Sequence, residues 1–592
     1  MNKREKDILL ILQKEGFINQ RNLSEVCKSS LGAVNRALKN LIQNGYLNEN
    51  INLTEKAYEL FRQKRTKNAI ILAAGFGMRM VPINTEIPKG LLNVYGEILI
   101  ERIIRQLHEV GIYEIYIVVG FMKEKYEYLI DKYGIELIVN PEYSKKNNLY
   151  SLHLVQKHIS NTYIIPCDIW CKNNPFNSHE LYSWYMVSDT QGNGSSVRVN
   201  REQELVAIPD NALGNTMIGI SYLEREKAKI VCERINQLSK EPLYNNAFWE
   251  ESLYQDNKMI VFAKLISSMD VAEINTYEQL RELDGDSNHL NTEAMNVIGE
   301  VFCVNNTDVY NIDVLKKGMT NRSFLFSIGD QRYIMRIPGE GTDNLINRVQ
   351  EAAVYTVISG RNICDDVAYI NPQNGYKITK YLEGARVCDP LNDDDVKKCM
   401  DKLRDFHRMQ IKVDHEFDVF GQLEFYEQLW KGAASVYRDY TETKKHVLEL
   451  KKYIHAYAEP KVLCHIDAVP DNFLFFTNTD GKEEIRLIDW EYAGMQDPHI
   501  DIAMFSIYAL YNKEQIDNLI DIYFEGKCDR KMRIKIYCYV AVCGLLWSNW
   551  CEYKRSLGVE FGEYSLRQYR YAKDYYRIVQ EELCKDSTDI YE

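Results

Sequence analysis

One stretch of the chain combines polar side chains whose types and spacing fit phosphoryl transfer. His465, Asp467 and Asn472 follow the pattern His-x-Asp-x-x-x-x-Asn, and Asp489 ends a later apolar run. Two short apolar segments joined by an Asp-Gly turn separate Asn472 from Asp489, which predicts a β-hairpin that returns Asp489 to Asn472. Phosphoryl transfer needs one carboxylate to orient the attacking hydroxyl, and an amide with a second carboxylate to hold Mg²⁺. The pattern therefore predicts an ATP-dependent phosphoryl-transfer site.

Further residues for such a site lie upstream. Gly318, Thr320 and Asn321 sit where one strand is predicted to turn into the next, and a glycine there lets backbone amides approach a triphosphate. Arg336 ends the following strand, and Glu351 lies in a predicted helix. A strand cation paired with a helix glutamate positions the α and β phosphates in kinase folds. Residues 376–384 are predicted to be the hinge strand that binds adenine through its backbone.

A second chemistry is indicated near residue 70. The apolar run AIILAA breaks into Gly75-x-Gly77-x-Arg79, and Lys89 follows in Pro-Lys-Gly-Leu-Leu. The glycines would let loop N–H groups hold a triphosphate, and the two cations supply the countercharge. Asp168 follows the apolar segment TYIIPC, so it stands at a strand's carboxyl end, where a parallel sheet places metal ligands. The pattern predicts a nucleotide site distinct from the first.

Alternating helical and apolar segments must position this second site. The pattern predicts helices and strands in βαβ order over residues 69–74, 101–112, 113–121, 123–135, 136–141 and 162–168. Such an order favours an open, Rossmann-like parallel sheet.

The first 65 residues differ from the rest in charge and pattern. An amphipathic helix ending in Gly16 is followed by two further helices, a short hairpin-like segment and another helix. This order resembles the winged helix-turn-helix of bacterial regulators. Residues 1–68 hold 13 Lys and Arg against 7 Asp and Glu, so the unit is basic in a chain of net charge −13. Arg36 and Lys39 lie on the predicted recognition helix, where they could contact DNA phosphates. DNA binding is weighted equally with a module that only dimerises the enzyme or senses a ligand.

The C-terminal half resembles the choline/ethanolamine kinase family, a branch of the aminoglycoside phosphotransferase-like kinases. The resemblance is carried by GMTNRSF, YIMRIPGEGTDNLINR, CHIDAVPDN and IDWEYAGMQDPHIDIA, from about residue 300 onward. It implies that Asp467 is the catalytic base, that Asn472 and Asp489 bind Mg²⁺, and that Glu491 assists.

Aromatic residues near the C-terminus fit the same resemblance. Trp547 and Trp550 share a helix face, and Tyr553 follows them. Aromatic rings hold quaternary ammonium groups by cation–π contact. Each ring alone is equally typical of a core stripe, but beside the resemblance the three predict a choline pocket.

Residues 67–285 resemble sugar-nucleotide pyrophosphorylase-type nucleotidyltransferases, and most of all the bacterial CTP:phosphocholine cytidylyltransferases. LAAGFGMRM, PKGLL, NNLYSL and YNNAFWEE carry the likeness. It implies that the glycine loop with Arg79 and Lys89 binds the triphosphate of CTP and that Asp168 binds Mg²⁺. It also implies that Asn147 and Ser151 lie near the nucleotide. Trp184 and Trp249, with Tyr150, are then candidates for the trimethylammonium pocket.

One position departs from this likeness. Asn275 stands where relatives commonly carry an aspartate that is the second metal ligand. An amide coordinates Mg²⁺ without adding charge, so the expectation is a weaker metal site or one that uses Glu273. Loss of the transferase activity is the alternative.

Together these patterns predict a multidomain α/β and α+β protein. Its expected parts are a winged helix (1–65), a Rossmann-like nucleotidyltransferase (67–285) and a bilobal kinase-like domain (295–592), with a polar linker at 282–294. The expected activities are choline phosphorylation by ATP and CMP transfer from CTP to phosphocholine. The same chemistry on ethanolamine or an aminophosphonate is an alternative, as is a regulator that uses the enzyme domains as ligand sensors.

Composition fits these expectations. A chain of 592 residues with 45% hydrophobic residues has room for several well-packed domains. The fourteen cysteines include no Cys-x-x-Cys, and no apolar stretch is long enough to span a bilayer, so we expect a reduced, cytoplasmic protein without membrane insertion. A homodimer is the expected assembly if the chain oligomerises.

Overall fold

The computed structural model forms two compact units. They comprise residues 1–307 with 312–314, and residues 308–311 with 315–592. The structure describes the whole chain except residues 28, 210, 318–320, 340–344, 479, 558, 560 and 589–592. The boundary falls later than the predicted linker at 282–294. That segment instead packs on the first unit, where the Tyr95 N–H donates to Asp284 at 2.6 Å.

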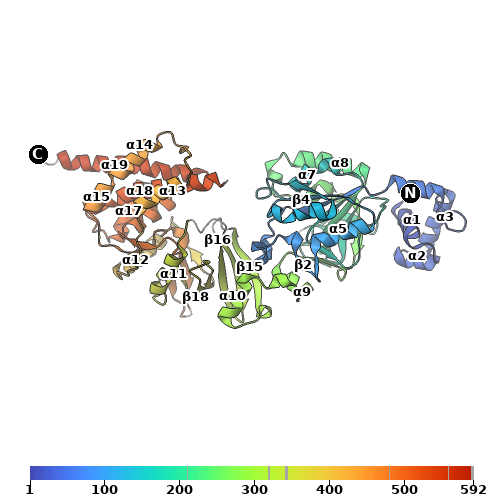
Figure 1. Ribbon diagram of the computed structural model, residues 1–592, viewed down its shortest axis with the longest axis horizontal. Coiled ribbons are helices and arrows are strands. Elements are labelled where there is room, and N and C mark those ends of the chain that lie inside the picture. The colour runs from blue at the N-terminus through green and yellow to red at the C-terminus, as the bar shows by residue number, and fades with distance from the viewer. Residues whose placement is uncertain are drawn as a thin grey trace. The chain divides into compact units, whose positions relative to one another are not determined.

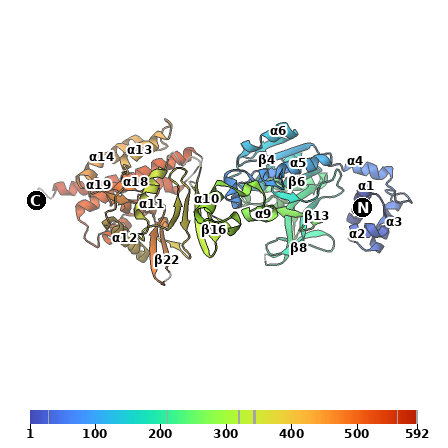
Figure 2. The ribbon, with the colours of Figure 1, turned by 60° about the horizontal axis from the view of Figure 1, so that its bottom comes forward.

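The first unit begins with the predicted winged helix. Its elements are α1 (Lys3–Glu15), α2 (Gln20–Val26), α3 (Leu31–Gln43), a Leu47–Leu53 bridge that forms the wing, and α4 (Glu55–Gln63). Asn2 and Glu5 form a capping box that begins α1. The helices lie together at the N-terminal end of the unit (Figure 2).

This module is packed against the nucleotidyltransferase part. The Tyr182 hydroxyl donates to Asp7 on α1 at 2.5 Å, and Lys64, just after α4, pairs with Glu224 at 2.7 Å. Apolar residues of α1, α3 and α4 belong to the same buried cluster as the transferase sheet. The winged helix is therefore a docked part of this unit.

A mixed sheet forms the centre of the nucleotidyltransferase part. Its strand order is β5-β4-β1-β6-β11-β8-β13-β10-β9. The bounds are β1 (Asn68–Ala73), β4 (Glu114–Val119), β5 (Glu136–Val139), β6 (Thr162–Pro166), β8 (Trp184–Gly192), β9 (Val197–Val199), β10 (Glu204–Ala207), β11 (Gly214–Leu223) and β13 (Lys258–Ile266). Strands β5, β4, β1 and β6 are parallel, as predicted, whereas β11 runs antiparallel to both β6 and β8.

Helices cover both faces of the parallel part because β1 is apolar on both sides. Ile70 and Leu72 face the cluster that contains α7 (Asn148–Leu154) and α8 (Arg225–Leu238), whereas Ala69 and Ile71 face the other cluster. That second face is covered by α5 (Leu99–Glu109) and α6 (Tyr128–Tyr133). Figure 1 shows α7 and α8 across the sheet from α5.

The second unit has two lobes. The N-terminal lobe is a sheet of order β15-β16-β17-β19-β18 with one helix. Its elements are β15 (Val309–Lys317), β16 (Asn321–Ile328), β17 (Gln331–Pro338), α11 (Arg348–Ile358), β18 (Val367–Ile370) and β19 (Lys377–Lys380).

The C-terminal lobe is largely helical. Its helices are α12 (Asp393–Arg408), α13 (Val419–Gln428), α14 (Tyr440–Glu449), α15 (Lys451–Ala456), α16 (Ile500–Tyr508), α17 (Lys513–Tyr523), α18 (Arg530–Ser556) and α19 (Glu563–Thr588). Short strands beside them carry the catalytic segment: β20 (Arg386–Val387), β21 (Val462–Cys464), β22 (Phe473–Thr477), β23 (Glu483–Leu487) and β24 (Gly494–Gln496).

The apolar segment YCYVAVCGLLW is the middle of α18. It is buried on nearly every side among the neighbouring helices, as a central core helix should be. None of the described helices has the length and hydropathy needed to cross a bilayer.

Candidate active sites

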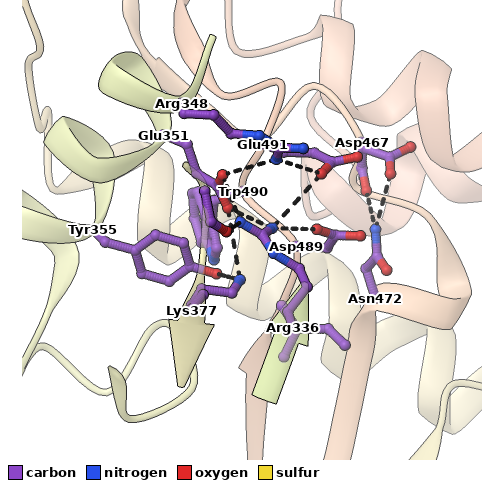
Figure 3. A network of polar contacts seen from close by, with 12 residues as sticks. Arg336, Arg348, Glu351, Tyr355, Lys377, Asp467, Asn472, Asp489, Trp490 and Glu491 are labelled. Atoms are coloured by element: carbon purple, nitrogen blue, oxygen red, sulfur yellow. Dashed lines mark hydrogen bonds and ion pairs between the residues drawn. The ribbon is translucent and has the colours of Figure 1, made fainter. Parts of the chain in front are cut away.

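The second unit contains a cavity of about 820 Å³ that gathers most of the predicted kinase residues. Asp467, Asn472, Asp489 and Glu491 line it together with Arg336 (Figure 3). The remaining lining comes from both lobes: Leu315, Ser323, Ile334, Asp365, Lys377, Thr379, Val469, Asp471, Ile488, Tyr492, Tyr508, Trp547, Trp550, Phe561 and Tyr564.

The predicted hairpin brings the phosphoryl-transfer residues together. Strands β22 and β23 pair with Phe473 opposite Leu487, so Asn472 and Asp489 flank the same end of the hairpin. The Asn472 amide nitrogen donates to the Asp467 carboxylate at 3.1 Å and to its backbone carbonyl at 2.9 Å. The amide oxygen of Asn472 is therefore the atom available to a cation.

The electrostatic environment of Asp467 suits a proton acceptor. Burial, and next the charge of Asp489, raise the pKa of Asp467 to about 7, although the hydrogen bond from Asn472 acts in the opposite direction. A base with a pKa near the working pH is efficient at accepting a hydroxyl proton. The same two causes raise the pKa of Glu491.

A buried aspartate fixes the backbone that carries Asp467. Asp501 accepts the N–H of His465 at 2.9 Å and that of Ile466 at 2.7 Å, and it lies 3.0 Å from His407 Nε2. Ile466 adopts the left-handed conformation with φ of 68°, which costs energy for a β-branched residue and needs such bonds. Sequence reasoning gave Asp501 no role.

Arg336 and Glu351 form the predicted ion pair. The two guanidinium nitrogens lie 2.6 and 2.8 Å from the two carboxylate oxygens, and both side chains are buried. Arg348 and Lys377 also approach Glu351, at 3.3 and 3.7 Å. Burial alone would raise the pKa of Glu351, but Arg336 and then Lys377 prevail and lower it to about 2. Sequence reasoning missed both additional cations.

Aromatic rings form the part of this cavity contributed by the C-terminal helices. Trp547 and Trp550 line it as predicted, and their ring centroids are 5.4 Å apart. Tyr553 does not line it, so its predicted place in the pocket is wrong. At about 100° per residue, Tyr553 lies about 120° around the helix from Trp547, whereas Trp550 lies about 60° from it. Four further rings line the cavity: Tyr492, Tyr508, Phe561 and Tyr564.

Part of the predicted triphosphate loop cannot be placed. Gly318 and Thr320 lie outside the described residues. Asn321 begins β16, but its side chain also lies outside the described part. Their nucleotide-binding roles stay predictions.

The first unit contains a second cavity, of about 880 Å³, at the carboxyl ends of β1 and β6. Gly75, Gly77, Arg79, Lys89 and Asp168 all line it, as predicted. Other predicted residues that line it are Asn147, Asn275 and the alternative ligand Glu273. Because β1 and β6 are parallel neighbours, the glycine loop after one and Asp168 after the other meet at one edge.

A small polar network occupies the edge of this cavity. Lys89 Nζ lies 3.2 Å from Asp168 and 2.7 Å from the Asn275 amide oxygen. Arg79 donates to the same oxygen at 3.2 Å. In this arrangement the Asn275 amide oxygen accepts from both cations that are predicted to bind phosphate, and its own predicted metal role stays a prediction.

Short strands explain why distant residues meet here. Strands β7 (Ile169–Cys171) and β14 (Val271–Glu273) pair with Glu273 opposite Ile169, and the Ile274 N–H donates to the Asp168 carbonyl at 3.0 Å. This pairing places residues 273–275 beside Asp168, about a hundred positions away in sequence. Burial raises the pKa of Glu273, an effect that the charge of Asp168 reinforces.

Four residues predicted for this site lie elsewhere. Tyr150 does not line the cavity, and Lys146 Nζ lies 4.3 Å from its ring centroid. Trp184 and Trp249 are each only 1% exposed and do not line the cavity, so their predicted contact with a trimethylammonium group is wrong. Trp184 instead packs beneath Lys264, whose Nζ lies 3.9 Å from the ring centroid. Ser151 is also buried away from the cavity, where its hydroxyl accepts from Asn140 at 3.0 Å.

Residues next to the two tryptophans in sequence form an aromatic and acidic wall of this cavity. Tyr185, Phe248 and Tyr254 line the cavity, and Phe248 is 60% exposed. The Tyr185 hydroxyl donates to Glu250 Oε1 at 2.9 Å, whereas Glu250 Oε2 is buried without a hydrogen-bond partner in the described structure. Burial raises the pKa of Glu250 to about 7. Phe248 and Glu250 are the sequence neighbours of Trp249. The aromatic motif therefore predicted the right segment of the chain but the wrong residue within it.

Three protein-family models match separate parts of the chain. A model of the choline/ethanolamine kinase family matches residues 312–551, a MobA-like NTP transferase domain model matches 69–178, and a winged helix-turn-helix DNA-binding model matches 1–48. The choline-phosphate cytidylyltransferase of Streptococcus pneumoniae is 31% identical over 221 residues, which cover 36% of this chain and 96% of the relative.

Other relatives match the second unit. Protein LicA of Haemophilus influenzae is 27% identical over 269 residues, covering 42% of this chain and 76% of the relative. A crystal structure of choline kinase LicA from Streptococcus pneumoniae aligns at 25% identity and a TM-score of 0.42, covering 48% of this chain and 99% of that one.

The chain is therefore an enzyme that joins a nucleotidyltransferase to a kinase behind a winged helix. It belongs to the choline-phosphate cytidylyltransferase family, and its C-terminal part carries a choline/ethanolamine kinase family domain.

Proposed function

We propose that this enzyme makes CDP-choline in two steps at two separate cavities. In the second unit, choline is phosphorylated by ATP. In the first, the phosphocholine oxygen attacks the α-phosphate of CTP and pyrophosphate leaves. The observation that carries the proposal is that each unit has a cavity pairing phosphate-binding or acidic groups with aromatic rings. The working division of the chain is residues 1–65, 67–285 and 295–592.

The kinase step is supported by the two kinds of residue that line its cavity. Asp467 is the group that accepts the choline hydroxyl proton, and Arg336 lies on the acidic side of the cavity. A quaternary ammonium has no N–H to donate, so the rings of Trp547 and Trp550 suit it better than a carbonyl or hydroxyl would. A hydroxyl two carbons from that ammonium would then lie toward Asp467.

The transferase step is likewise supported by two kinds of residue in its cavity. Lys89 and Arg79 beside the glycine loop provide countercharge to a triphosphate and to the pyrophosphate that leaves. Glu250 with Tyr185 and Phe248 forms an acidic, aromatic wall suited to the ammonium end of phosphocholine.

Both cavities fit a divalent cation of the Mg²⁺ class, which prefers oxygen ligands. In the kinase cavity Asp489 and the Asn472 amide oxygen would hold it, with Glu491 nearby. In the transferase cavity Asp168 would hold it, and Glu273 is the nearest further carboxylate on the paired strand. When bound, the ion offsets phosphate charge.

The test supplies purified protein with choline, ATP, CTP and Mg²⁺, and follows phosphocholine and CDP-choline separately. Asp467→Asn is expected to abolish phosphocholine formation but to leave CDP-choline synthesis from added phosphocholine. Asp168→Asn is expected to do the reverse. Loss of both steps in either variant would contradict two independent sites, and absence of both products with the unaltered protein would refute the proposal.

The amine is the part of the proposal that needs its own comparison. Among the similar proteins, one is a 2-aminoethylphosphonate cytidylyltransferase from Lancefieldella rimae, 28% identical over 238 residues. The ring-lined kinase cavity favours choline, since a primary ammonium gains most from hydrogen-bond acceptors. Choline should therefore exceed ethanolamine in kcat/KM by at least tenfold. Equal values would contradict selection of choline by the rings, and a higher value for ethanolamine would favour the smaller amine.

A second candidate function, DNA binding, is favoured by the face that α3 leaves exposed. Val34, Ala37 and Leu38 are buried against the module, whereas Arg36 and Lys39 are exposed. Retention on duplex DNA should weaken steeply with salt. Arg36→Ala with Lys39→Ala should reduce the salt slope by about one for each phosphate that is no longer neutralised. Specific DNA retention by a protein without measurable turnover would favour the regulator hypothesis instead.

A further inference from the structure

Lys377 is a buried cation in the kinase cavity that neither the motifs nor the proposed chemistry uses. It begins β19 and stands directly opposite Arg336 on β17 in the strand register. Lys377 is 6% exposed and Arg336 5%, and both line the same cavity. Two cations side by side repel each other, so their retention in a buried place calls for anionic partners.

The two terminal guanidinium nitrogens of Arg336 are bound to protein groups, whereas its Nε is buried without a hydrogen-bond partner in the described structure. Its two terminal nitrogens bind the two oxygens of Glu351, and one of them also donates to the Gly375 carbonyl at 3.1 Å. The guanidinium lies 3.8 Å from Asp489 and 3.7 Å from Glu491. Its charge therefore serves to hold acidic side chains from both lobes together (Figure 3).

The contacts of Lys377 leave it better able to bind a ligand. Its Nζ donates to the Tyr355 hydroxyl at 2.7 Å and lies 3.7 Å from Glu351, which is beyond hydrogen-bond distance. An ammonium has three N–H donors, and the described structure supplies one short acceptor. The ammonium lies beside the hydroxyl end of the Tyr355 ring, with Nζ 4.5 Å from the ring centroid.

We infer that Lys377 binds the polyphosphate of the nucleotide, as a second phosphate-contacting cation beside the Arg336–Glu351 pair. The ligand must be anionic, because the amine substrate is a cation that Lys377 repels, and the aromatic wall for it lies on the C-terminal helices. A lysine also suits the task, because it contacts phosphate as a compact point charge. The inference rests on the proposed ATP-dependent kinase function.

The test measures binding of a non-hydrolysable ATP analogue and of adenosine to the full-length protein with Mg²⁺, by calorimetry. Lys377→Met keeps the chain length but removes the charge. This variant is expected to bind the ATP analogue at least tenfold more weakly, whereas its affinity for adenosine should change less than twofold. Lys377→Arg, which retains the charge, should stay within threefold of the unaltered protein. Lys380→Met, at an exposed position of the same strand, is the matched control and should bind both ligands normally.

The outcomes separate the inference from the function on which it rests. Equal weakening of analogue and adenosine by Lys377→Met, or unchanged binding of both, would overturn the phosphate role. If Lys377→Met fails to fold, Lys377→Arg decides alone, and a tenfold loss of analogue affinity in that folded variant would also overturn it. If the unaltered protein binds no ATP analogue while its transferase is active, the kinase proposal itself fails.

Discussion

Replacing Glu351 by glutamine should destabilise the kinase unit strongly, because this carboxylate stabilises several buried cations. Glutamine has nearly the same shape but no charge. It would leave Arg336, Arg348 and Lys377 within 4 Å of a neutral amide. Breaking a buried ion pair by removing one partner typically costs about 3–5 kcal/mol.

The pKa of Glu351 gives an independent magnitude. Its pKa is lowered from 4.5 to about 2 in the folded protein, and each unit is worth about 1.4 kcal/mol, so ionised Glu351 contributes about 3 kcal/mol. Because the folded pKa lies below the unfolded one, this stabilisation is fully present above about pH 4.5. It is lost as the pH falls toward 2.

The assay is denaturant unfolding of the full chain at pH 7, followed by tryptophan fluorescence and resolved for its separate transitions, since two units need not unfold together. Glu351→Gln should lower the free energy of unfolding of the kinase unit by about 3 kcal/mol. Glu424→Gln, at an exposed position of α13, is the matched control and should change it by less than about 0.5 kcal/mol. A loss below about 1 kcal/mol for Glu351→Gln would refute the reasoning.

The two cavities give three further predictions. Because Glu250 has a pKa near 7, its charge is present above that pH, so KM for phosphocholine should rise as the pH falls from 8 to 6. In the Glu250→Gln variant this rise of KM at low pH should be absent. If the variant keeps the pH profile of the unaltered protein, Glu250 is not part of the wall that binds the amine. Trp550→Ala should raise KM for choline at least tenfold, whereas Tyr553→Ala should change it less than twofold; similar effects would contradict the aromatic wall. Lys89→Met should reduce kcat of CMP transfer at least a hundredfold and spare choline phosphorylation, as the two sets of products would report.

The local sequence pattern was sufficient to predict where the residues that directly follow strands would lie. The glycine loop after β1 and Asp168 after β6 could be predicted to meet because parallel neighbours end at one edge of a sheet. In the same way an Asp-Gly turn between two apolar segments predicted the β22–β23 hairpin, and so the approach of Asp489 to Asn472. Both inferences depend on contacts that secondary structure enforces directly.

Side-chain direction within a helix or strand was harder to predict. Trp184 and Trp249 had the right residue type, but the packing of the sheet turned them into the core and left Phe248 and Glu250 facing the cavity. The same applies to Tyr553, which lies on the helix of Trp547 and Trp550 but does not line their cavity. Aromatic residues are common in both cores and binding walls, so type alone does not separate them.

The amino-acid sequence by itself determined the order of the domains, the two nucleotide chemistries and the residues that follow the key strands. These depend on short-range spacing and periodicity, which are written in the chain. Only the tertiary structure decided that Lys377 lies opposite Arg336 in the sheet, that Asn275 accepts from Lys89, and that Asp501 accepts from the backbone just before Asp467. Those contacts join residues from 35 to 186 positions apart, and burial determines how strongly their charges interact. Neither these long-range contacts nor the burial exists before the chain has folded.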